Sequence, residues 1–348
     1  MNAATWPRED KSRERLLWID PAAATFGDAH VGDLPSRLRR GDLLVVNDAA
    51  VLPASLVGET DEGRRVEARL VAPEKHGWKA VLFGAGDWRT RTEDRPPPPA
   101  LVSGDRVTFA SNLTAIVARA SEGRVVTLRF TNEGDSFWSA LYQHGRPVQY
   151  AYTRAPLPLF HVQSAYAAEP WAVEMPSAGR PLTFALIRDL RRRGINVARV
   201  THAAGLSSTG DAALDATLPW PERYRVPAET VSDIEATQRA RGRVVAVGTT
   251  VVRALEGVVR DRGALVPGDG VTSLRIGPGF VPRVVSGLFT GIHDPSASHF
   301  MLLQAFAGRD LLTQAYDHAS LAGYAGHEFG DSCLILRDTS ASRGLAAA

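Results

Sequence analysis

The chain lacks the cysteines, long apolar runs and N-terminal apolar segment that mark disulfide-bonded, membrane-spanning and secreted proteins. It holds one cysteine, Cys333, among 348 residues, which excludes an internal disulfide and a cysteine-rich metal site. No apolar run approaches the roughly 20 residues that cross a bilayer. The N-terminal "MNAATWPREDKSRERLLWID" lacks the apolar core of a signal peptide. We therefore expect a cytoplasmic protein with no membrane partner.

Familiar catalytic and nucleotide-binding motifs are also missing. There is no G-x-x-x-x-G-K-[ST] phosphate loop, no G-x-G-x-x-G after a strand and no H-E-x-x-H. "GLSSTG", Gly205 to Gly210, has the wrong spacing for the nucleophile elbow of a serine hydrolase. The 9 histidines form no close pair at helical spacing with a carboxylate. We expect neither a serine hydrolase nor a metal site.

Charge and apolar content are those of an ordinary globular protein, with a formal net charge of +2 and 44% hydrophobic residues. A charge this small does not demand a polyanionic partner, but local patches rather than totals bind phosphate. The densest basic run is "RDLRRRG", and a solvated helix face is the more usual role of such a run. Nucleic-acid contact is the alternative, and its candidate residues are Arg188, Arg191, Arg192 and Arg193.

The pattern along the chain predicts two structural units, as its length allows. "GDLLVVNDAAVLPASLVG" reads as a buried strand that ends in a polar loop. From about Val66 to Phe130, short alternating stretches separated by Gly, Asp and Pro indicate a small antiparallel barrel. After Asp135, helix-like segments alternate with strands such as "INVARVTH" and "RVVAVG". We expect a mixed α/β domain, residues 1–60 and 151–348, with a β-barrel inserted at 61–150.

The stretch "AVGTTVVRALEG" reads as a strand, a polar turn and a helix. Thr249 and Thr250 stand where the helix begins, so their hydroxyls cap it or hold a ligand at its N-terminus. Arg253 and Glu256 lie on one helix face. The arginine is a candidate to bind a carboxylate, and an intrahelical ion pair between the two is the alternative.

Two histidines follow strand-like runs and are candidates for acid–base catalysis. His202 lies in "VTHAAG" and His293 in "TGIHDPSAS". A structural hydrogen bond is the alternative role for each ring. Pro295, in the same loop as His293, is included as a substrate-contact candidate.

Further polar candidates lie at other strand ends. Asn47 and Asp48 close "LLVVND", where they can bind ribose hydroxyls or an amine, or form an Asx turn. Asp331, in "FGDSCLIL", is another acid between a loop and a strand. In "MPSAG", small residues permit close approach of backbone N–H groups to a ligand, or cap the following helix. The residues concerned are Ser177, Ala178 and Gly179.

The order of these loops resembles that of the S-adenosylmethionine:tRNA ribosyltransferase-isomerases of queuosine biosynthesis. The resemblance runs from about Lys11 to Leu336, nearly the whole chain. The matching segments are "KSRERLLWID", "DLPSRLRRGDLLVVNDAAVLPASLVG", "VQSAYA", "MPSAG", "VTHAAG", "PERYRVP", "VGTTVVRALE", "IGPGF", "IHDPSASHFMLLQAFAG" and "FGDSCLIL".

The resemblance implies an α/β domain with an inserted β-barrel and S-adenosylmethionine as co-substrate. Such enzymes donate its ribosyl portion to the aminomethyl group of a deazaguanine in a tRNA anticodon, giving epoxyqueuosine-tRNA, adenine and methionine. The sulfonium acidifies the adjacent C5′ hydrogens, so that a base generates a carbanion that opens the ribose and expels adenine. The amine then attacks the ribose carbon skeleton, and ring closure releases methionine.

The chain departs from the family pattern in several loops. Where the family commonly has Pro-Thr-Ala-Gly-Leu-His-Phe-Thr, this sequence has "PSAGRPLTF", so Arg180 and Pro181 replace a leucine and a histidine. Where it has Thr-Asn-Phe-His-Leu-Pro, this sequence has "TGIHDP", with Gly291 in place of the asparagine amide and Asp294 beside the histidine. A carboxylate beside His293 is expected to favour its imidazolium form.

Three functions therefore remain open at the level of sequence. The first is the family reaction on tRNA. The second is a paralogue that uses S-adenosylmethionine on a different, small-molecule acceptor or cleaves it without tRNA. The third is a non-catalytic binding protein on the same fold, because a fold alone does not secure a function.

Overall fold

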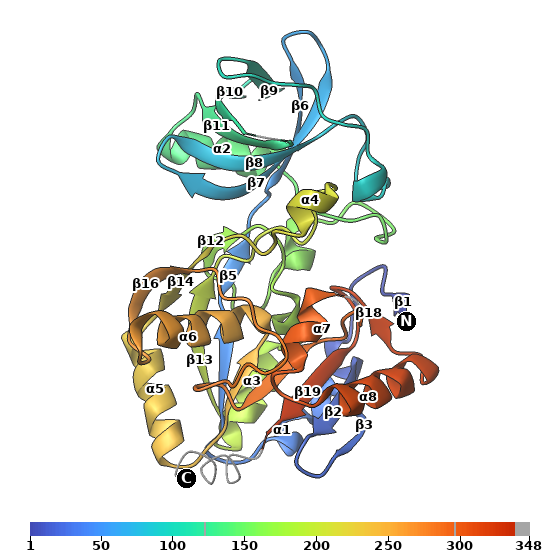
Figure 1. Cartoon of the computed structure of the whole chain (residues 1–348), viewed down its shortest axis with the longest axis vertical. Helices are drawn as coiled ribbons and strands as arrows, with labels where there is room; N and C mark the ends of the chain where they lie inside the picture. The colour runs from blue at the N-terminus through green and yellow to red at the C-terminus, as the bar shows by residue number, and fades with distance from the viewer. Residues whose placement is uncertain (122, 296, 338–348) are drawn as a thin grey trace.

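A nine-stranded mixed sheet and a closed barrel make up most of the computed structural model, which describes residues 1–121, 123–295 and 297–337 (Figure 1). The barrel lies at one end of the molecule and the sheet, with its helices, at the other. This arrangement confirms the predicted fold class, a mixed α/β domain with a small antiparallel β-barrel.

The sheet has four parallel central strands, β13, β4, β15 and β17, and antiparallel neighbours β14 and β19 on its two sides. In order across the sheet, the strands are β16 (Gly268–Thr272), β14 (Glu222–Val226), β13 (Asn196–His202), β4 (Leu43–Asn47), β15 (Val244–Val247), β17 (Gly287–Gly291), β19 (Ser332–Leu336), β2 (Arg15–Asp20) and β3 (Thr25–His30).

Helices cover both faces of this sheet, which explains why "LLVVN" in β4 is continuously apolar rather than alternating. Leu43 and Val45 join the core beneath α5, α6 and α8, whereas Leu44 and Val46 join the core beneath α1 and α3. The α-helices are α1 (Leu34–Arg37), α2 (Gly134–His144), α3 (Phe184–Arg192), α4 (Ala212–Asp215), α5 (Ala228–Arg239), α6 (Thr249–Arg262), α7 (Ser298–Leu303) and α8 (Arg309–Leu321).

The barrel encloses its own apolar core, to which α2 contributes Phe137 and Leu141. Among the core residues, Arg69 donates to Glu67 over 2.8 Å, and Arg95 also donates to Glu67, so this buried carboxylate is matched by two cations. The strands, in order around the barrel, are β10 (Leu113–Ala120), β11 (Val125–Phe130), β8 (Gly77–Phe83), β7 (Arg65–Glu74), β6 (Ser55–Thr60) and β9 (Arg106–Ala110).

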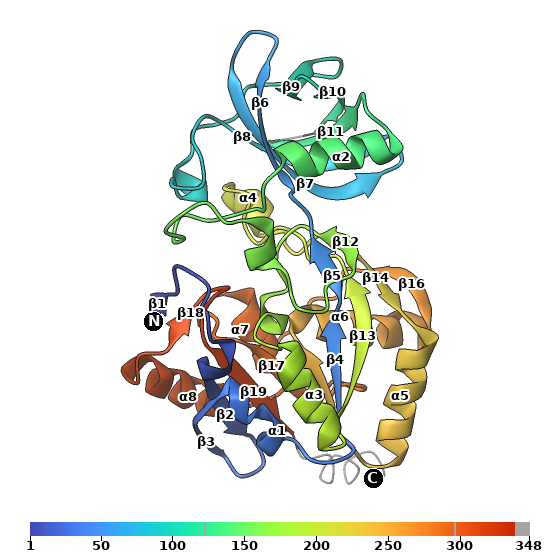
Figure 2. The same ribbon diagram turned by 180° about the vertical axis from the view of Figure 1, so that it is seen from behind.

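The carboxyl ends of the central strands face the barrel. From β4 the chain continues through β5 (Ala49–Val51) into β6 of the barrel, as Figures 1 and 2 show. There β5 pairs in parallel with β12 (Glu169–Ala172). A second short pair, β1 (Asn2–Ala3) with β18 (Ala325–Gly326), holds the N-terminus. The strand ends that carry the candidate residues therefore lie between the two units.

The regular elements predicted from periodicity are confirmed with small shifts. "INVARVTH" and "RVVAVG" form β13 and β15, and "LTFALIRDLRRRG" forms α3. The stretch "ASHFMLLQAFAGRDLLTQAYDHA" forms two helices, α7 and α8, because Gly308 begins the second as its N-cap. The domain limits at residues 60 and 150 stay a prediction.

Candidate active site

The carboxyl edge of the central strands gathers most of the predicted site residues. In an open α/β sheet, ligands bind beyond the carboxyl ends of the parallel strands. The antiparallel strands β14 and β19 begin at the same edge, so Glu222 and Asp331 also lie there. The predicted residues in the loops, strand ends and first helical turns at this edge are Asn47, Asp48, Ser177, Ala178, Gly179, His202, Thr249, Thr250, Arg253, His293, Pro295 and Asp331.

Asn47 ties three of these segments together. Its Nδ2 donates to the carbonyl of His202 over 2.9 Å and to Oγ1 of Thr250 over 3.3 Å. Its Oδ1 accepts from the N–H of His202 over 2.9 Å and from that of Ala49 over 3.1 Å. The last bond is the Asx turn weighed for this residue. Asn47 fixes the relative positions of β4, β13 and α6 in the site.

His202, Glu222 and Arg253 form the buried centre of the site. Arg253 donates from Nη1 to Glu222 and from Nε to the carbonyl of Leu274, the latter over 3.0 Å. Glu222 also accepts from the N–H of Gly205, and one of its oxygens lies 3.4 Å from Nε2 of His202. Nη2 of Arg253 and both ring nitrogens of His202 have no hydrogen-bond partner among the described residues.

These open atoms are unusual because buried polar groups are nearly always hydrogen-bonded. His202 is 0% exposed and Arg253 8% exposed. Burial first, and then the positive charge of Arg253, lower the pKa of His202 well below its ordinary value. Burial raises the pKa of Glu222, and Arg253 opposes that rise. The site therefore combines a carboxylate whose oxygens are both engaged with a neutral imidazole and a cation that each have an unpaired hydrogen-bonding atom.

His293 lies in a second cluster on the loop after β17. Its Nε2 is 2.8 Å from Oγ1 of Thr290, and its ring stacks on that of His299 with centroids 5.0 Å apart. Burial and His299 lower the pKa of His293 to about 3. The expectation that Asp294 favours the imidazolium of His293 is therefore wrong, because burial dominates. Pro295 lies in the exposed turn that follows.

Asp48 points toward β13 rather than into water. Its Oδ1 accepts from Oγ1 of Thr201 over 2.6 Å, and its Oδ2 lies 3.6 Å from Arg199. Burial raises the pKa of this carboxyl against the effects of Thr201 and Arg199. A carboxylate with a raised pKa beside the site is suited to accept a proton from an amine.

Asp331 is fully engaged by the protein itself. Its Oδ1 accepts from the N–H of Arg15 over 3.0 Å and from the guanidinium of Arg8, and its Oδ2 accepts from the N–H of Ala325 over 2.8 Å. At 1% exposure, this carboxylate links the N-terminal segment to β18 and β19. A direct catalytic role for Asp331 stays a prediction, and its contacts are those of an anchor.

The small residues of "MPSAG" form a 3₁₀ turn, Ser177–Gly179, beside the start of α6. A Cβ built on Gly248 would stand 3.4 Å from the Cβ of Ala178, and one built on Gly179 would stand 2.2 Å from the hydroxyl of Tyr166. The two glycines therefore let the hydroxyl of Tyr166 and the side chain of Ala178 pack closely against the backbone here.

Gly248 itself has φ of 93°, a conformation that side-chain-bearing residues rarely adopt. We predict that Gly248→Ala lowers the free energy of unfolding by about 1–2 kcal/mol, because the left-handed region is strained for alanine. Urea unfolding measures this, with Gly277→Ala as the control, since no atom lies within 4 Å of a Cβ built there and no positive φ is required. Equal stability of the two variants would contradict the prediction.

The hydroxyls of Thr249 and Thr250, at the start of α6, do not cap this helix. Gly248 is the N-cap, and no side chain caps this helix. Thr250 accepts the bond from Asn47, and Thr249 is buried beside it. Glu256 lies two turns into α6 and accepts backbone N–H groups of Arg283, Val284 and Val285, each over 2.9 Å. Arg253 and Glu256 thus bind different partners instead of each other.

The altered "PSAGRPLTF" segment is buried. Arg180 is 1% exposed and donates to Glu14, which is 0% exposed, while its aromatic neighbour is Phe329. The arginine that replaces the family leucine is thus accommodated by a buried ion pair, and Pro181 beside it has no side-chain hydrogen-bonding group.

A small cavity of about 10 Å³ lies between the barrel connection and the α/β domain. Glu328 lines it together with Glu174, which accepts a hydrogen bond from the hydroxyl of Tyr150. Burial raises the pKa of Glu328 from 4.5 to about 7. A carboxyl whose pKa is higher in the folded than in the unfolded protein adds stability at low pH, and that contribution is lost as the pH rises through the folded-state value.

We therefore predict that the wild-type protein loses about 2 kcal/mol of stability, relative to Glu328→Gln, between pH 4.5 and pH 8. The neutral amide does not titrate, so the variant lacks this part of the pH dependence. Urea unfolding at both pH values measures the difference. Exposed Glu229→Gln is the matched control, and a pH dependence of Glu328→Gln identical to that of the wild type would contradict the assignment.

The predicted nucleic-acid residues lie at the opposite edge of the sheet. Arg188, Arg191 and Arg192 are in α3, and Arg193 follows it. The chain then reaches Gly194, whose carbonyl accepts from the N–H of Gly41 just before β4 begins. The structure does not bring these arginines beside His202.

Sequence reasoning did not single out Glu222, His299 or Tyr166. Glu222 was visible only as part of "PERYRVP", and its role depends on contact with Arg253, 31 residues away. His299 is the second residue of α7, and the helix-like pattern of that segment gave no reason to single it out. Tyr166 donates to the carbonyl of Gly179 over 3.3 Å, a contact between loops that no local pattern indicates.

Within residues 1–121, 123–295 and 297–337, no group of three His, Cys, Asp or Glu side chains is placed to hold a metal ion. In the same part of the chain, no helix combines the length and apolar character that a membrane crossing requires.

Comparison with known proteins shows which family this chain matches. A family model described as "Queuosine biosynthesis protein" matches residues 1–335. A protein of Gluconacetobacter diazotrophicus is 38% identical, over 96% of this chain and 93% of its own length. One of Synechococcus elongatus is 39% identical, over 95% of this chain and 91% of its own length. Both are named S-adenosylmethionine:tRNA ribosyltransferase-isomerase.

A solved structure is similar along the whole chain. The crystal structure of S-adenosylmethionine tRNA ribosyltransferase from Thermotoga maritima shares 26% identity with this chain, covers 96% of each chain and gives a TM-score of 0.52. The fold and these matches together define an enzyme of the transferase-isomerase class. The chain belongs to the S-adenosylmethionine:tRNA ribosyltransferase-isomerase family of queuosine biosynthesis, which confirms the resemblance of its ordered motifs.

Proposed function

We propose that this chain transfers and isomerises the ribosyl moiety of S-adenosylmethionine onto the aminomethyl group of a deazaguanine in the anticodon region of tRNA, with release of adenine and methionine. The observation that supports this most is the buried cluster of His202, Glu222 and Arg253, with open hydrogen-bonding atoms on two of its members. It lies beyond the carboxyl ends of the central strands in a chain of this family.

Arg253 is proposed to bind the carboxylate of the methionine moiety. Glu222 and Leu274 hold two of its nitrogens, and Nη2 is left for a further acceptor. A guanidinium fixed in this way forms short, charge-assisted bonds with a carboxylate. The start of α6, with Thr249 and Thr250, is proposed to bind the neighbouring part of the same substrate through hydroxyl and N–H groups.

His202 is proposed to remove the C5′ proton. Glu222 lies 3.4 Å from Nε2, which favours the tautomer with its proton on that nitrogen and leaves a lone pair on Nδ1. This is the division of roles in which a carboxylate orients an imidazole and the imidazole transfers the proton. The neutral state of His202, caused by its burial, is the state that a base requires.

Two further groups suit the later steps. The neutral His293 is proposed to hydrogen-bond the adenine as it leaves, with Thr290 orienting the ring. Asp48 is proposed to accept a proton from the aminomethyl group, because an ammonium must lose a proton before its nitrogen can attack carbon. Asn47 then serves to hold these strand ends in register.

The proposal is tested by incubating the purified protein with S-adenosylmethionine, alone, with unmodified tRNA and with tRNA that carries the aminomethyl-deazaguanine. We expect release of adenine and methionine, in equal amounts, only in the incubation that contains the modified tRNA. Release in every incubation would indicate a different acceptor or simple cleavage of S-adenosylmethionine. No release and no binding of S-adenosylmethionine would indicate a non-catalytic protein on this fold.

A further inference from the structure

The solvent-exposed face of α3 carries an aromatic ring followed by arginines at regular spacing. Phe184, Arg188 and Arg192 lie four residues apart, so they form one stripe along the helix. Phe184 is 68% exposed although it is a large apolar residue. On the opposite face of α3, Leu186, Ile187 and Leu190 are buried, and Leu186 and Leu190 join the core beside the sheet. The stripe is therefore not required by the fold.

This stripe leads from the candidate active site to the far edge of the sheet. At its start, Thr183 caps α3 just after the Ser177–Gly179 turn, which packs beside Gly248. At its end, Gly194 bonds Gly41 at the beginning of β4. Figure 2 shows α3 in front of the sheet, running away from the barrel. The five residues of β4 correspond to roughly 17 Å between the two edges.

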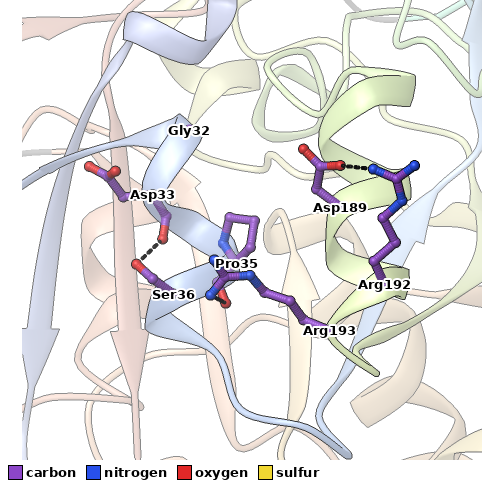
Figure 3. A pocket seen from close by; sticks show the side chains of 7 residues that line it. All are labelled: Gly32, Asp33, Pro35, Ser36, Asp189, Arg192 and Arg193. Carbon is purple, nitrogen blue, oxygen red and sulfur yellow. Dashed lines mark hydrogen bonds and ion pairs between the residues drawn. The ribbon is translucent and has the colours of Figure 1, made fainter.

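At the far edge, the stripe ends beside an open, polar cavity. Its volume is about 280 Å³. Figure 3 shows Arg193 reaching across to Pro35, whose carbonyl accepts from its Nη1 over 3.4 Å, and Arg192 facing Asp189 at 3.6 Å. The cavity is lined by Gly32, Asp33, Pro35, Ser36, Asp189, Arg192 and Arg193.

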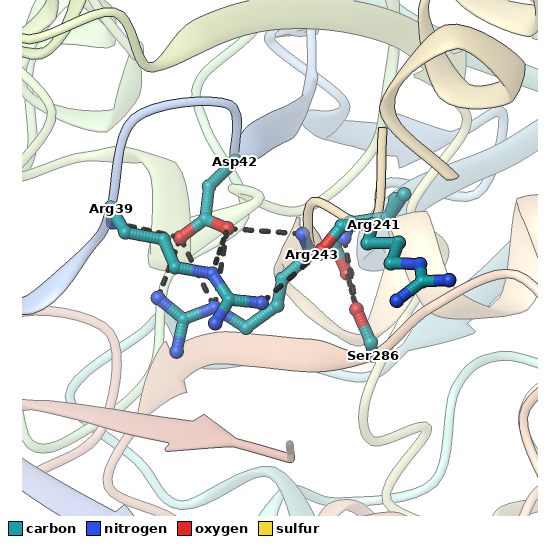
Figure 4. Close-up of polar contacts among 6 residues, drawn as sticks. Arg39, Asp42, Arg241, Arg243 and Ser286 are labelled. Carbon is teal, nitrogen blue, oxygen red and sulfur yellow. Dashed lines mark hydrogen bonds and ion pairs between the residues drawn. The ribbon is translucent and has the colours of Figure 1, made fainter. Parts of the chain in front are cut away.

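In the cavity lining, the carboxylates of Asp33 and Asp189 match Arg192 and Arg193 in number, and further arginines lie outside the lining. The buried Asp42 is already matched by Arg243, at 2.6 Å, and by Arg39, at 3.6 Å (Figure 4). In the part of the chain that the structure describes, the exposed Arg40 and Arg191 take part in no ion pair. Arg40, which packs against Gly194 at the end of α3, and Arg191, in the last turn of that helix, therefore remain available to an external anion.

Helix electrostatics explain only part of this pattern. Arginines in the last turn of a helix interact favourably with its C-terminal partial charge, and α6 ends in Arg260 and Arg262 in the same way as α3 ends in Arg191 and Arg192. The effect does not reach Arg188, which precedes the last turn, or account for the exposed ring of Phe184 in the first turn.

We propose that Phe184, Arg188, Arg192 and Arg193, here called the α3 track, bind the RNA whose anticodon loop enters the site. Phe184, nearest the site, stacks on an unpaired base of the loop, and the arginines contact phosphates of the adjoining stem. Aromatic rings interleaved with cations along one surface are typical of RNA-binding proteins. This inference rests on the proposed function and adds the path that the RNA takes.

The test measures binding of unmodified tRNA by fluorescence anisotropy over a series of salt concentrations. Arg188→Glu/Arg192→Glu is expected to weaken binding about 10- to 100-fold and to reduce the slope of log affinity against log salt by about two. The affinity for S-adenosylmethionine should stay within twofold of the wild type. Arg260→Glu/Arg262→Glu is the matched control and should bind tRNA as the wild type does, because it changes the same charges at the end of α6.

Phe184→Ala supplies a test without a change of charge. We expect roughly tenfold weaker binding with an unchanged salt slope. The proposal that the α3 track binds RNA is wrong if both the Arg188/Arg192 and the Phe184 variants bind tRNA within twofold of the wild type. It is also wrong if the wild type binds no tRNA. If the wild-type protein binds tRNA through these residues but releases no adenine with the modified tRNA, the proposed function is overturned. The inference that the α3 track binds RNA would still hold.

Discussion

His202→Gln is expected to lower kcat by about 10²- to 10⁴-fold while changing the affinity for S-adenosylmethionine by less than about threefold. The amide resembles the imidazole in size and polarity but cannot take the C5′ proton. His202 is wholly buried, with both ring nitrogens open and one of them 3.4 Å from Glu222, so its contribution should be to the chemical step.

Single-turnover release of adenine measures the chemical step, and equilibrium binding of S-adenosylmethionine measures the affinity. His76→Gln, in an exposed turn of the barrel, is the matched control and should behave as the wild type. Glu222→Gln should also slow the step, since an amide no longer selects the Nε2–H tautomer. A His202→Gln variant with kcat within threefold of the wild type would show that another residue is the base.

Arg253→Met should weaken binding of S-adenosylmethionine by about 10²-fold, because it removes the cation proposed to bind the methionine carboxylate. It should also lower the free energy of unfolding by about 3–5 kcal/mol, because Glu222 is then left as a buried carboxylate without its partner. Isothermal titration calorimetry gives the first quantity and urea unfolding the second.

The double variant Arg253→Met/Glu222→Gln separates the two effects. The neutral amide removes the buried charge, so most of the lost stability should return, whereas the affinity for S-adenosylmethionine should not. Recovery of affinity together with stability would show that Arg253 acts only as a structural partner of Glu222. Arg260→Met, at the exposed end of α6, is the control for loss of an arginine from the same helix.

Local patterns predicted the scaffold well because they report burial and turn chemistry directly. "LLVVND" gave a buried strand and a polar strand end, and both are present in β4 and the residues after it. The short alternating stretches gave the barrel. "AVGTTVVRALEG" gave β15, the turn at Gly248 and α6. In each case, the residues that decide the structure are neighbours in sequence.

The partners of the site residues could not be predicted in this way. Sequence spacing placed Arg253 and Glu256 on one face of a helix, yet the first bonds Glu222 and the second bonds the backbone from Arg283 onwards. These contacts join segments that meet only when the sheet forms. The protonation of His293 was mistaken for a similar reason, since the burial that lowers its pKa depends on tertiary packing and not on the adjacent Asp294.

The basic run shows the same limit in a different form. Its arginines were candidates for nucleic-acid contact, but α3 runs toward the other edge of the sheet before most of them occur. The sequence does not reveal the direction in which this helix runs. Because α3 runs away from the site, Phe184 lies nearest the site and the arginines at the end of the helix lie farthest from it.

The fate of the ribosyl carbon atoms tests the central claim most directly. S-adenosylmethionine with a uniformly ¹³C-labelled ribose is incubated with the protein and with tRNA that carries the aminomethyl-deazaguanine, and the tRNA nucleosides are then analysed by mass spectrometry. We predict that all of the labelled ribosyl carbons appear on the modified deazaguanine nucleoside, in an amount equal to the adenine and the methionine released. Unlabelled tRNA accompanied by free adenine and labelled small molecules would contradict the account.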